Sequence, residues 1–196
     1  MSGVSRLRCF VADAVRIVER EKSEAAILAK LGAKLEALVS VDDWLPQAYA
    51  QSDGKAYQQY LLYADPLDRF SVVSFVWGPG QGTPIHDHRV WGLVGVLRGE
   101  EVSVSYERLQ DGSLQARARE RLSRGRVVAV SPRIGDIHAI SNGLSDTSSI
   151  SIHVYGGNIG VIRRSVFDAK TGAAREFISG YSNDAIPNLW LEAEAA

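Results

Sequence analysis

The first forty residues carry apolar positions at the spacing of α-helices. Between residues 5 and 20, six apolar residues share one helical face: Leu7, Phe10, Val11, Ala14, Val15 and Val18. A second helix is predicted after Ser23, because Glu24 places negative charge in its first turn and four leucines repeat along one side. Residues 42–46 predict a third, short helical turn. We expect these elements to form a helical cap over residues 1–50.

From residue 57 onward, the pattern changes to short aromatic and β-branched runs separated by turn residues. The predicted strands cover residues 57–63, 70–77, 90–97, 101–108, 114–121, 126–131 and 148–155, with two last strands at 161–167 and 174–179. Many short strands without interleaved helices indicate a sandwich or barrel. The chain of 196 residues is therefore predicted to be one mainly β domain (1–196), in which the cap precedes a β-barrel over residues 57–180.

Composition excludes several classes of partner. With 45% hydrophobic and 23% charged residues the chain can bury a core, and its net charge of −1 offers no basic field for nucleic acid or an anionic membrane. The sequence contains no run of about 18 apolar residues, so no membrane span is predicted. Charged residues interrupt any signal-peptide core at the N-terminus, and the single Cys9 precludes an internal disulfide, so we expect a cytoplasmic protein. The oligomeric state stays open.

The histidines suggest a metal site. His86 and His88 are two residues apart, so on one strand both imidazoles point to the same face. His138 lies in a second β-branched region, which suits a strand that returns beside the first. Three imidazoles from two strands can hold one transition metal and leave coordination positions open. Imidazole suits Fe, Zn, Cu or Ni; zinc would favour hydrolysis, whereas Fe(II) would favour activation of O₂.

The fourth histidine lies in an alternating strand. Ser151, His153 and Tyr155 project from one face, so a hydrogen-bonded chain from the Ser151 hydroxyl through His153 to the Tyr155 phenol is possible. The alternative is an ordinary polar strand face with a half-buried tyrosine. Beside a metal with three histidine ligands, we interpret this hydrogen-bonded chain as one in which His153 fixes the position of the Tyr155 phenol.

The two histidine turns resemble the paired motifs of the cupin family, which are double-sheet, jelly-roll-like β-barrels with a metal at the centre. The first motif is matched by Gly80, His86, His88 and Gly99, and the second by Pro132, Gly135, His138 and Asn142. Gly92 stands where the first motif has a glutamate. The resemblance therefore implies a cupin-type barrel whose metal has three neutral histidine ligands.

Together with the Ser-x-His-x-Tyr triad, this set closely resembles the thiol dioxygenases of the cysteine dioxygenase family. The resemblance runs from Tyr57 through Arg164. It implies Fe(II) at His86, His88 and His138, with both atoms of O₂ added to the sulfur of a small thiol to give a sulfinate. Tyr155 is then expected to hydrogen-bond to oxygen or to the substrate.

Two departures from the animal enzymes bear on the substrate. Gly92 replaces the cysteine that they cross-link to the triad tyrosine, so we expect an uncrosslinked Tyr155. Gln59 stands at their carboxylate-binding arginine, and a compensating arginine is expected at Arg164, with Arg163 as the alternative. Arg89 is expected to be solvated or at the pocket mouth.

This pattern is similar to bacterial 3-mercaptopropionate dioxygenases and favours that substrate. L-cysteine is the alternative. Two less favoured hypotheses are a zinc or nickel cupin acting as isomerase or hydrolase, and a non-catalytic cupin that binds a small acid.

Overall fold

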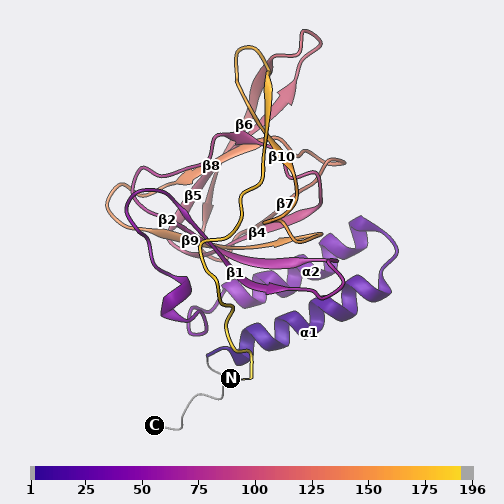
Figure 1. The fold of residues 1–196 in the computed structure, drawn as a ribbon, viewed down its shortest axis with the longest axis vertical. Helices are drawn as coiled ribbons and strands as arrows, with labels where there is room; N and C mark the ends of the chain where they lie inside the picture. Colours follow the sequence, from indigo (N-terminus) through magenta and orange to yellow (C-terminus); the bar gives the residue numbers. More distant parts are fainter. Residues whose placement is uncertain (1–2, 191–196) are drawn as a thin grey trace.

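Two helices precede two antiparallel β-sheets in the computed structural model, which describes residues 3–190 (Figure 1). Both predicted helices are confirmed, as α1 (Ser5–Arg20) and α2 (Glu24–Val39). The Ser23 hydroxyl caps α2 by accepting a hydrogen bond from the Ala26 amide at 3.2 Å. The third helical turn was predicted too early: a 3₁₀ turn covers Gln47–Tyr49 instead. Pro46 explains this shift, because a proline disfavours helical backbone at the residue before it.

The strands form one sheet of five and one of six, as the predicted mainly β, double-sheet architecture requires. The five-stranded sheet has the order β1-β2-β9-β4-β7, and the six-stranded sheet has the order β11-β10-β3-β8-β5-β6. The bounds of the first are β1 Gln58–Ala64, β2 Ser71–Trp77, β9 Ser149–Tyr155, β4 Gly92–Arg98 and β7 Val127–Val130. The bounds of the second are β11 Ala174–Phe177, β10 Arg164–Phe167, β3 Ile85–His86, β8 His138–Asn142, β5 Glu100–Arg108 and β6 Leu114–Ser123.

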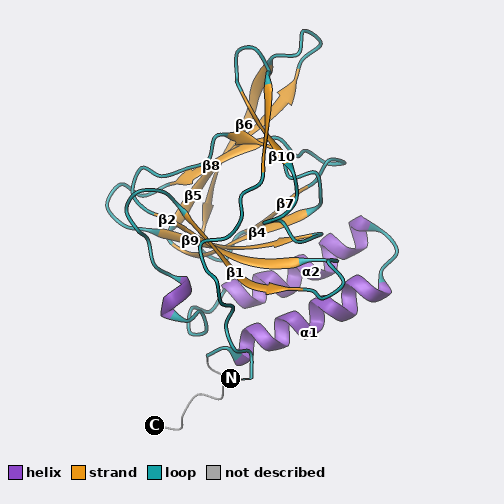
Figure 2. Ribbon diagram, viewed as in Figure 1, coloured by secondary structure: helices purple, strands orange, loops and turns teal. Residues whose placement is uncertain are grey.

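The five-stranded sheet is buried on both faces. Figure 2 shows α1 and α2 lying side by side along the outer face of this sheet. Every residue of β2 and β9 is buried. Along β9, Ile150, Ile152 and Val154 join the core under the helices, while the residues between them face the space between the two sheets. Two-sided burial explains why β2 appears in the sequence as a mostly apolar run, and why the polar face of β9 is buried as well.

Two hairpins of the six-stranded sheet, β5–β6 and β10–β11, project together from the body of the molecule, at the top of Figure 1. The hairpin tips contact each other, since the Leu114 amide donates to the Ala169 carbonyl at 3.2 Å. The side chains of β6 are mostly exposed between its buried ends. Within residues 3–190, no helix combines the length and apolar character that crossing a bilayer requires.

Candidate metal centre

Three histidines from the six-stranded sheet and its adjoining turn meet at one point. His86 on β3 and His138 on β8 are paired directly across the antiparallel ladder. The three rings of His86, His88 and His138 form a nearly equal-sided triangle, with centroids 4.8 Å apart in each pair. Their ligating nitrogens lie within 4.8 Å of one another, and all three side chains are buried. The expectation that the strand of His138 returns beside the first histidines is confirmed.

His88 reaches this cluster from a turn. The prediction that His86 and His88 share one strand was wrong, because β3 ends at His86. Asp136 holds the turn in place: its Oδ2 accepts hydrogen bonds from the backbone amides of His88 and Arg89, each at 3.0 Å. Its Oδ1 accepts a third from His88 Nδ1 at 2.9 Å. Asp136 therefore fixes both the backbone and the ring of His88.

The histidine nitrogens that face the cluster are available as metal ligands. His86 Nδ1 donates to the Pro84 carbonyl at 3.1 Å, and His88 Nδ1 donates to Asp136, so each Nε2 keeps its lone pair. Burial and the neighbouring His88 lower the pKa of His86 to about 3. Burial likewise holds the pKa of His138 well below its usual value. His88 Nε2 is buried without any hydrogen-bond partner, which is the environment that a bound divalent ion would satisfy.

The charge of Asp136 also favours a cation here. Burial alone would raise the pKa of this carboxyl, but the hydrogen bonds from His88 and from the Arg89 backbone outweigh it and lower the pKa. Asp136 is therefore ionised at neutral pH, and it bonds directly to the ring of His88. A carboxylate that orients a metal-binding histidine in this way raises the basicity of the ligand.

Ser151, His153 and Tyr155 form a buried hydrogen-bonded chain beside the cluster. The Ser151 hydroxyl lies 2.8 Å from His153 Nε2, and His153 Nδ1 lies 2.7 Å from the Tyr155 hydroxyl. The Trp77 indole N–H donates to Ser151 Oγ at 3.2 Å. The Tyr155 ring stacks on His88, with centroids 5.4 Å apart. Burial raises the pKa of Tyr155, so the phenol keeps its proton at neutral pH.

Gly92 lies directly against the tyrosine. It is paired with Tyr155 across the β4–β9 ladder, and a Cβ at this position would lie 2.9 Å from the Tyr155 ring carbon Cδ1. A side chain at position 92 would therefore meet the ring, which explains how a cysteine there can be linked to it in other enzymes. The one cysteine of this chain, Cys9, is exposed on α1, and an uncrosslinked Tyr155 stays our prediction.

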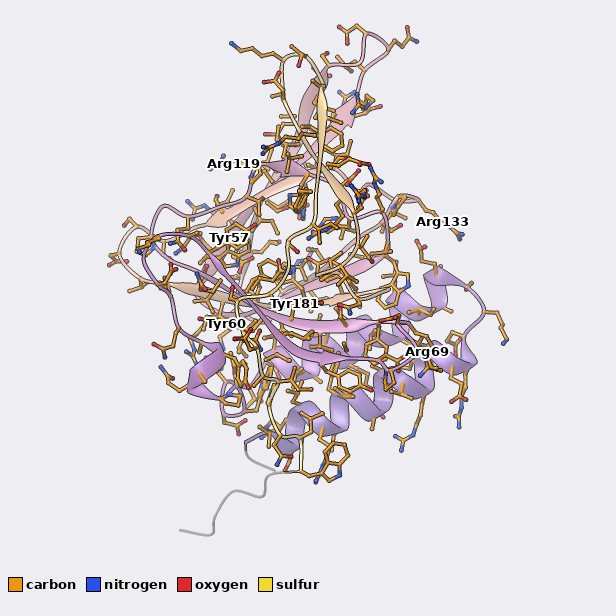
Figure 3. The ribbon with its side chains drawn as sticks, in the orientation of Figure 1. Tyr57, Tyr60, Arg69, Arg119, Arg133 and Tyr181 are labelled. Atoms are coloured by element: carbon orange, nitrogen blue, oxygen red, sulfur yellow. The ribbon has the colours of Figure 1, made fainter. Side chains whose placement is uncertain are left out.

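A cavity of about 210 Å³ connects the metal cluster, the tyrosine chain and a buried arginine. Its walls include His86, His138, His153, Tyr155, Gln59 and Arg164. Aromatic rings of β2 and of Tyr57, the residue before β1, also line the cavity, and the ring centroids of Tyr57 and Trp77 lie 4.8 Å apart. Figure 3 places Tyr57 and Tyr181 in the middle of the molecule, while Arg133 extends from its edge.

Arg164 brings an unpaired positive charge into this cavity. It begins β10 and is only 3% exposed. Its Nη2 donates to Ser179 Oγ at 2.6 Å, and its guanidinium lies 4.7 Å from the centroid of the Phe177 ring. Nε is buried without a partner, and among the described residues no carboxylate pairs with this guanidinium. Burial lowers the pKa of Arg164, although arginine stays charged. A buried cation of this kind is suited to an anionic ligand.

Gln59 supports the same arginine from β1. Its amide nitrogen donates to Ser179 Oγ at 3.0 Å and to the Gly180 carbonyl at 2.9 Å. Since a carbonyl only accepts, the second bond fixes which end of the amide is nitrogen. Gln59 thus leaves its oxygen, an acceptor, for any other partner. Ser179, which joins Gln59 to Arg164, was not among the residues predicted from the sequence.

The other two arginines considered from the sequence lie away from the cavity lining. The Arg163 side chain is 63% exposed and approaches Glu176. Arg89 donates to Ser165 Oγ at 2.9 Å and lies within 3.7 Å of Asp87. Arg175 of β11 lines the cavity instead and was not anticipated. Successive residues of a strand point to opposite faces, so the side chains of Arg163 and Arg164 point in different directions. This rule can separate the two arginines only once the start of β10 at Arg164 is known.

Comparisons with known proteins found similar solved structures and a matching family. Among solved structures, similar chains include a protein of Thermus thermophilus (17% identity, TM-score 0.46, 60% of this chain and 97% of that one). Others are a double-stranded β-helix protein of Klebsiella pneumoniae (18%, 0.46, 57% and 82%) and an RmlC-like cupin of Desulfovibrio desulfuricans (19%, 0.44, 59% and 96%). The family model of cysteine dioxygenase type I matches residues 2–168. The chain therefore belongs to the cysteine dioxygenase type I family.

Proposed function

We propose that this protein is an Fe(II)-dependent thiol dioxygenase that converts a small thiol carboxylate and O₂ into the corresponding sulfinate. His86, His88 and His138 are proposed to hold the iron. The single observation that carries the proposal is the cavity in which the three-histidine cluster, the Tyr155 hydroxyl and the Arg164 guanidinium meet. Bound iron would supply the activation of O₂ toward sulfur, which no protein side chain provides.

The protein residues bind the substrate and control protons. Arg164 is proposed to bind the carboxylate, with Ser179 and Phe177 holding the guanidinium in one orientation. This places the thiol end of a short substrate toward the histidines. Tyr155 is proposed to donate its hydroxyl proton to the reacting oxygen or to the substrate, since the phenol is neutral. The aromatic rings of Tyr57, Phe75 and Trp77 in the cavity lining are proposed to keep water from the reacting atoms.

We favour 3-mercaptopropionate as the substrate because the lining of the cavity carries positive charge, from Arg164 and Arg175, and no negative charge. Among the described residues that line it, none is Asp or Glu. An ammonium group bound there would be buried without a carboxylate, which is costly. 3-Mercaptopropionate carries a thiol and a carboxylate and has no amine.

L-cysteine is the second candidate, and the orientation of Gln59 favours it. Both hydrogen bonds of the Gln59 amide nitrogen go to the segment at Ser179 and Gly180. The remaining amide oxygen is an acceptor that suits the ammonium group of an amino acid. The two substrates therefore differ in whether Gln59 contacts them.

Metal analysis combined with oxygen uptake tests the function. We expect protein produced without added metal to bind iron and to consume one O₂ per thiol, with the sulfinate identified by mass spectrometry. The ratio of kcat/KM for 3-mercaptopropionate to that for L-cysteine decides the substrate. Stoichiometric zinc or nickel without oxygen uptake would support a cupin isomerase or hydrolase, and binding of both acids without turnover would support a non-catalytic cupin.

Substituting Tyr155 by phenylalanine tests the assigned role of the phenol. We expect kcat to fall roughly 10- to 100-fold, because one hydrogen bond to a charged reacting group is removed. Iron content should stay the same, since Tyr155 is not proposed as a ligand. Tyr60→Phe is the matched control, because the Tyr60 hydroxyl bonds to the Gln51 carbonyl at 2.8 Å rather than joining the buried chain. Equal activities for the two variants would remove Tyr155 from the mechanism.

A further inference from the structure

A buried carboxyl group lies near the other end of the hydrogen-bonded chain that ends at Tyr155. Glu101 lies on β5 and is fully buried, and neither of its oxygens has a hydrogen-bond partner that meets normal geometry. Across the interior it faces the Ser151 hydroxyl and the Trp77 indole, the two side chains whose hydrogen bonding lowers its pKa. Nothing in the metal cluster or the substrate cavity explains why a glutamate occupies this position.

Among residues 3–190, no charged side chain forms an ion pair with Glu101 that could balance a carboxylate. Its ladder partners are Asn142 on β8 and Leu122 on β6. The Asn142 amide already donates to the carbonyls of Trp77 and Thr147. Burial raises the pKa of Glu101 to about 8, against smaller opposing effects of Ser151 and Trp77. The titratable group that a charge on Glu101 would affect is Tyr155, whose pKa it would raise further. Glu101 is therefore a neutral carboxylic acid at pH 7.

A neutral Glu101 gives the chain one direction of hydrogen bonding. The Trp77 indole N–H can only donate, so Ser151 accepts from it, and the acid proton of Glu101 can occupy the second lone pair of Ser151. The Ser151 proton is then left for His153 Nε2, and His153 carries its own proton on Nδ1. His153 Nδ1–H donates to the Tyr155 oxygen, which frees the phenol proton for the cavity.

We propose that protonated Glu101 is a positioning residue that directs the phenol proton of Tyr155 into the substrate cavity through Ser151 and His153. An ionised Glu101 reverses the chain. Its carboxylate accepts the Ser151 proton, His153 donates to Ser151 from Nε2, and Tyr155 donates to His153 Nδ1. Glu101 releases one proton to solvent, and the chain otherwise only redistributes its hydrogens. The phenol then offers lone pairs to the cavity in place of a proton.

The tautomer of His153 reports this reversal without any turnover. The probe is ¹⁵N NMR of the imidazole nitrogens in protein loaded with Zn(II), a diamagnetic substitute for iron, with His153 assigned from its absence in His153→Gln. We expect the proton on Nδ1 at pH 7 and on Nε2 at pH 9. In Glu101→Gln the side chain stays neutral, and the Nδ1 tautomer should persist to pH 9. A His153 tautomer that does not change with pH in the wild-type protein would overturn the inference, even if the variant failed to fold.

Oxygen uptake gives the second measurement, which rests on the proposed dioxygenase function. For a group that ionises near pH 8, kcat should fall about tenfold between pH 7 and pH 9 in the wild-type enzyme. In Glu101→Gln the ratio of kcat at pH 7 to kcat at pH 9 should stay within about twofold. Glu100→Gln, which changes the neighbouring ion-paired glutamate, should keep the wild-type pH profile.

The two measurements fail separately. If neither the wild-type protein nor any variant forms a sulfinate but the His153 tautomer follows pH as expected, the proposed reaction is wrong and the role of Glu101 stands. If sulfinate forms and Glu101→Gln loses activity at high pH as the wild type does, Glu101 does not set the direction of the chain.

Discussion

Replacing His138 by alanine is expected to abolish stoichiometric metal binding and to leave no measurable turnover. Loss of a residue that merely orients a ligand weakens metal binding by roughly 10- to 100-fold, and removal of a ligand itself should exceed that range. His86 and His88 alone leave the ion with a vacant third position, which water would fill. Metal content after dialysis and oxygen uptake measure the two effects together.

His153→Ala is the matched control for this substitution. His153 is as deeply buried as His138, but it bonds to Ser151 and Tyr155 rather than joining the cluster. We expect this variant to keep its metal and to lose activity, because the phenol is no longer held. If His138→Ala retained one equivalent of iron and normal turnover, the three-histidine centre would not be the catalytic site.

Replacing Arg164 by leucine should lower kcat/KM for thiol carboxylates by on the order of 100-fold or more. Truncating one partner of a buried, hydrogen-bonded charge pair typically costs about 2–5 kcal/mol, and each 1.4 kcal/mol is about tenfold. The cause is specific to the carboxylate. Activity with 2-mercaptoethanol, which lacks a carboxylate, should therefore change by no more than about threefold.

Arg163→Leu separates the arginine of the cavity from its neighbour. The Arg163 side chain is 63% exposed and should be replaceable with little effect on kcat/KM. If Arg163→Leu were the more damaging change, carboxylate binding would have to be reassigned. A parallel loss for 2-mercaptoethanol in Arg164→Leu would show that Arg164 maintains the cavity rather than binding the substrate.

Local rules were enough to predict the central side chains. Side chains two residues apart on a strand share a face, which correctly grouped Ser151, His153 and Tyr155. The Gly/Pro-marked turn at the second motif correctly placed His138 beside His86. Each of these inferences depends on residues close in sequence, or on strands that a common motif brings together.

Groups whose role depends on chain closure were not predictable in the same way. Asp136 lies within the second motif, but its bonds to His88 exist only because two turns fold against each other. Ser179 becomes relevant when the C-terminal segment crosses Gln59 and Arg164. Glu101 follows another glutamate at the start of a strand, which in sequence resembles a solvated edge. Its burial arises from closure of the two sheets and has no local signal.

Strand β9 makes the rigidity of the reaction centre depend on distant packing. Alternate residues along this one backbone serve two layers, since Ile152 contacts the core under the helices while His153 holds the tyrosine. On the adjacent strand, a Cβ at Gly95 would lie 3.0 Å from Leu35 of α2, so the helix rests almost directly on the sheet. Substitutions that change the thermal stability of the helical cap would therefore also shift the proposed reaction centre, and the two properties of this protein would evolve together.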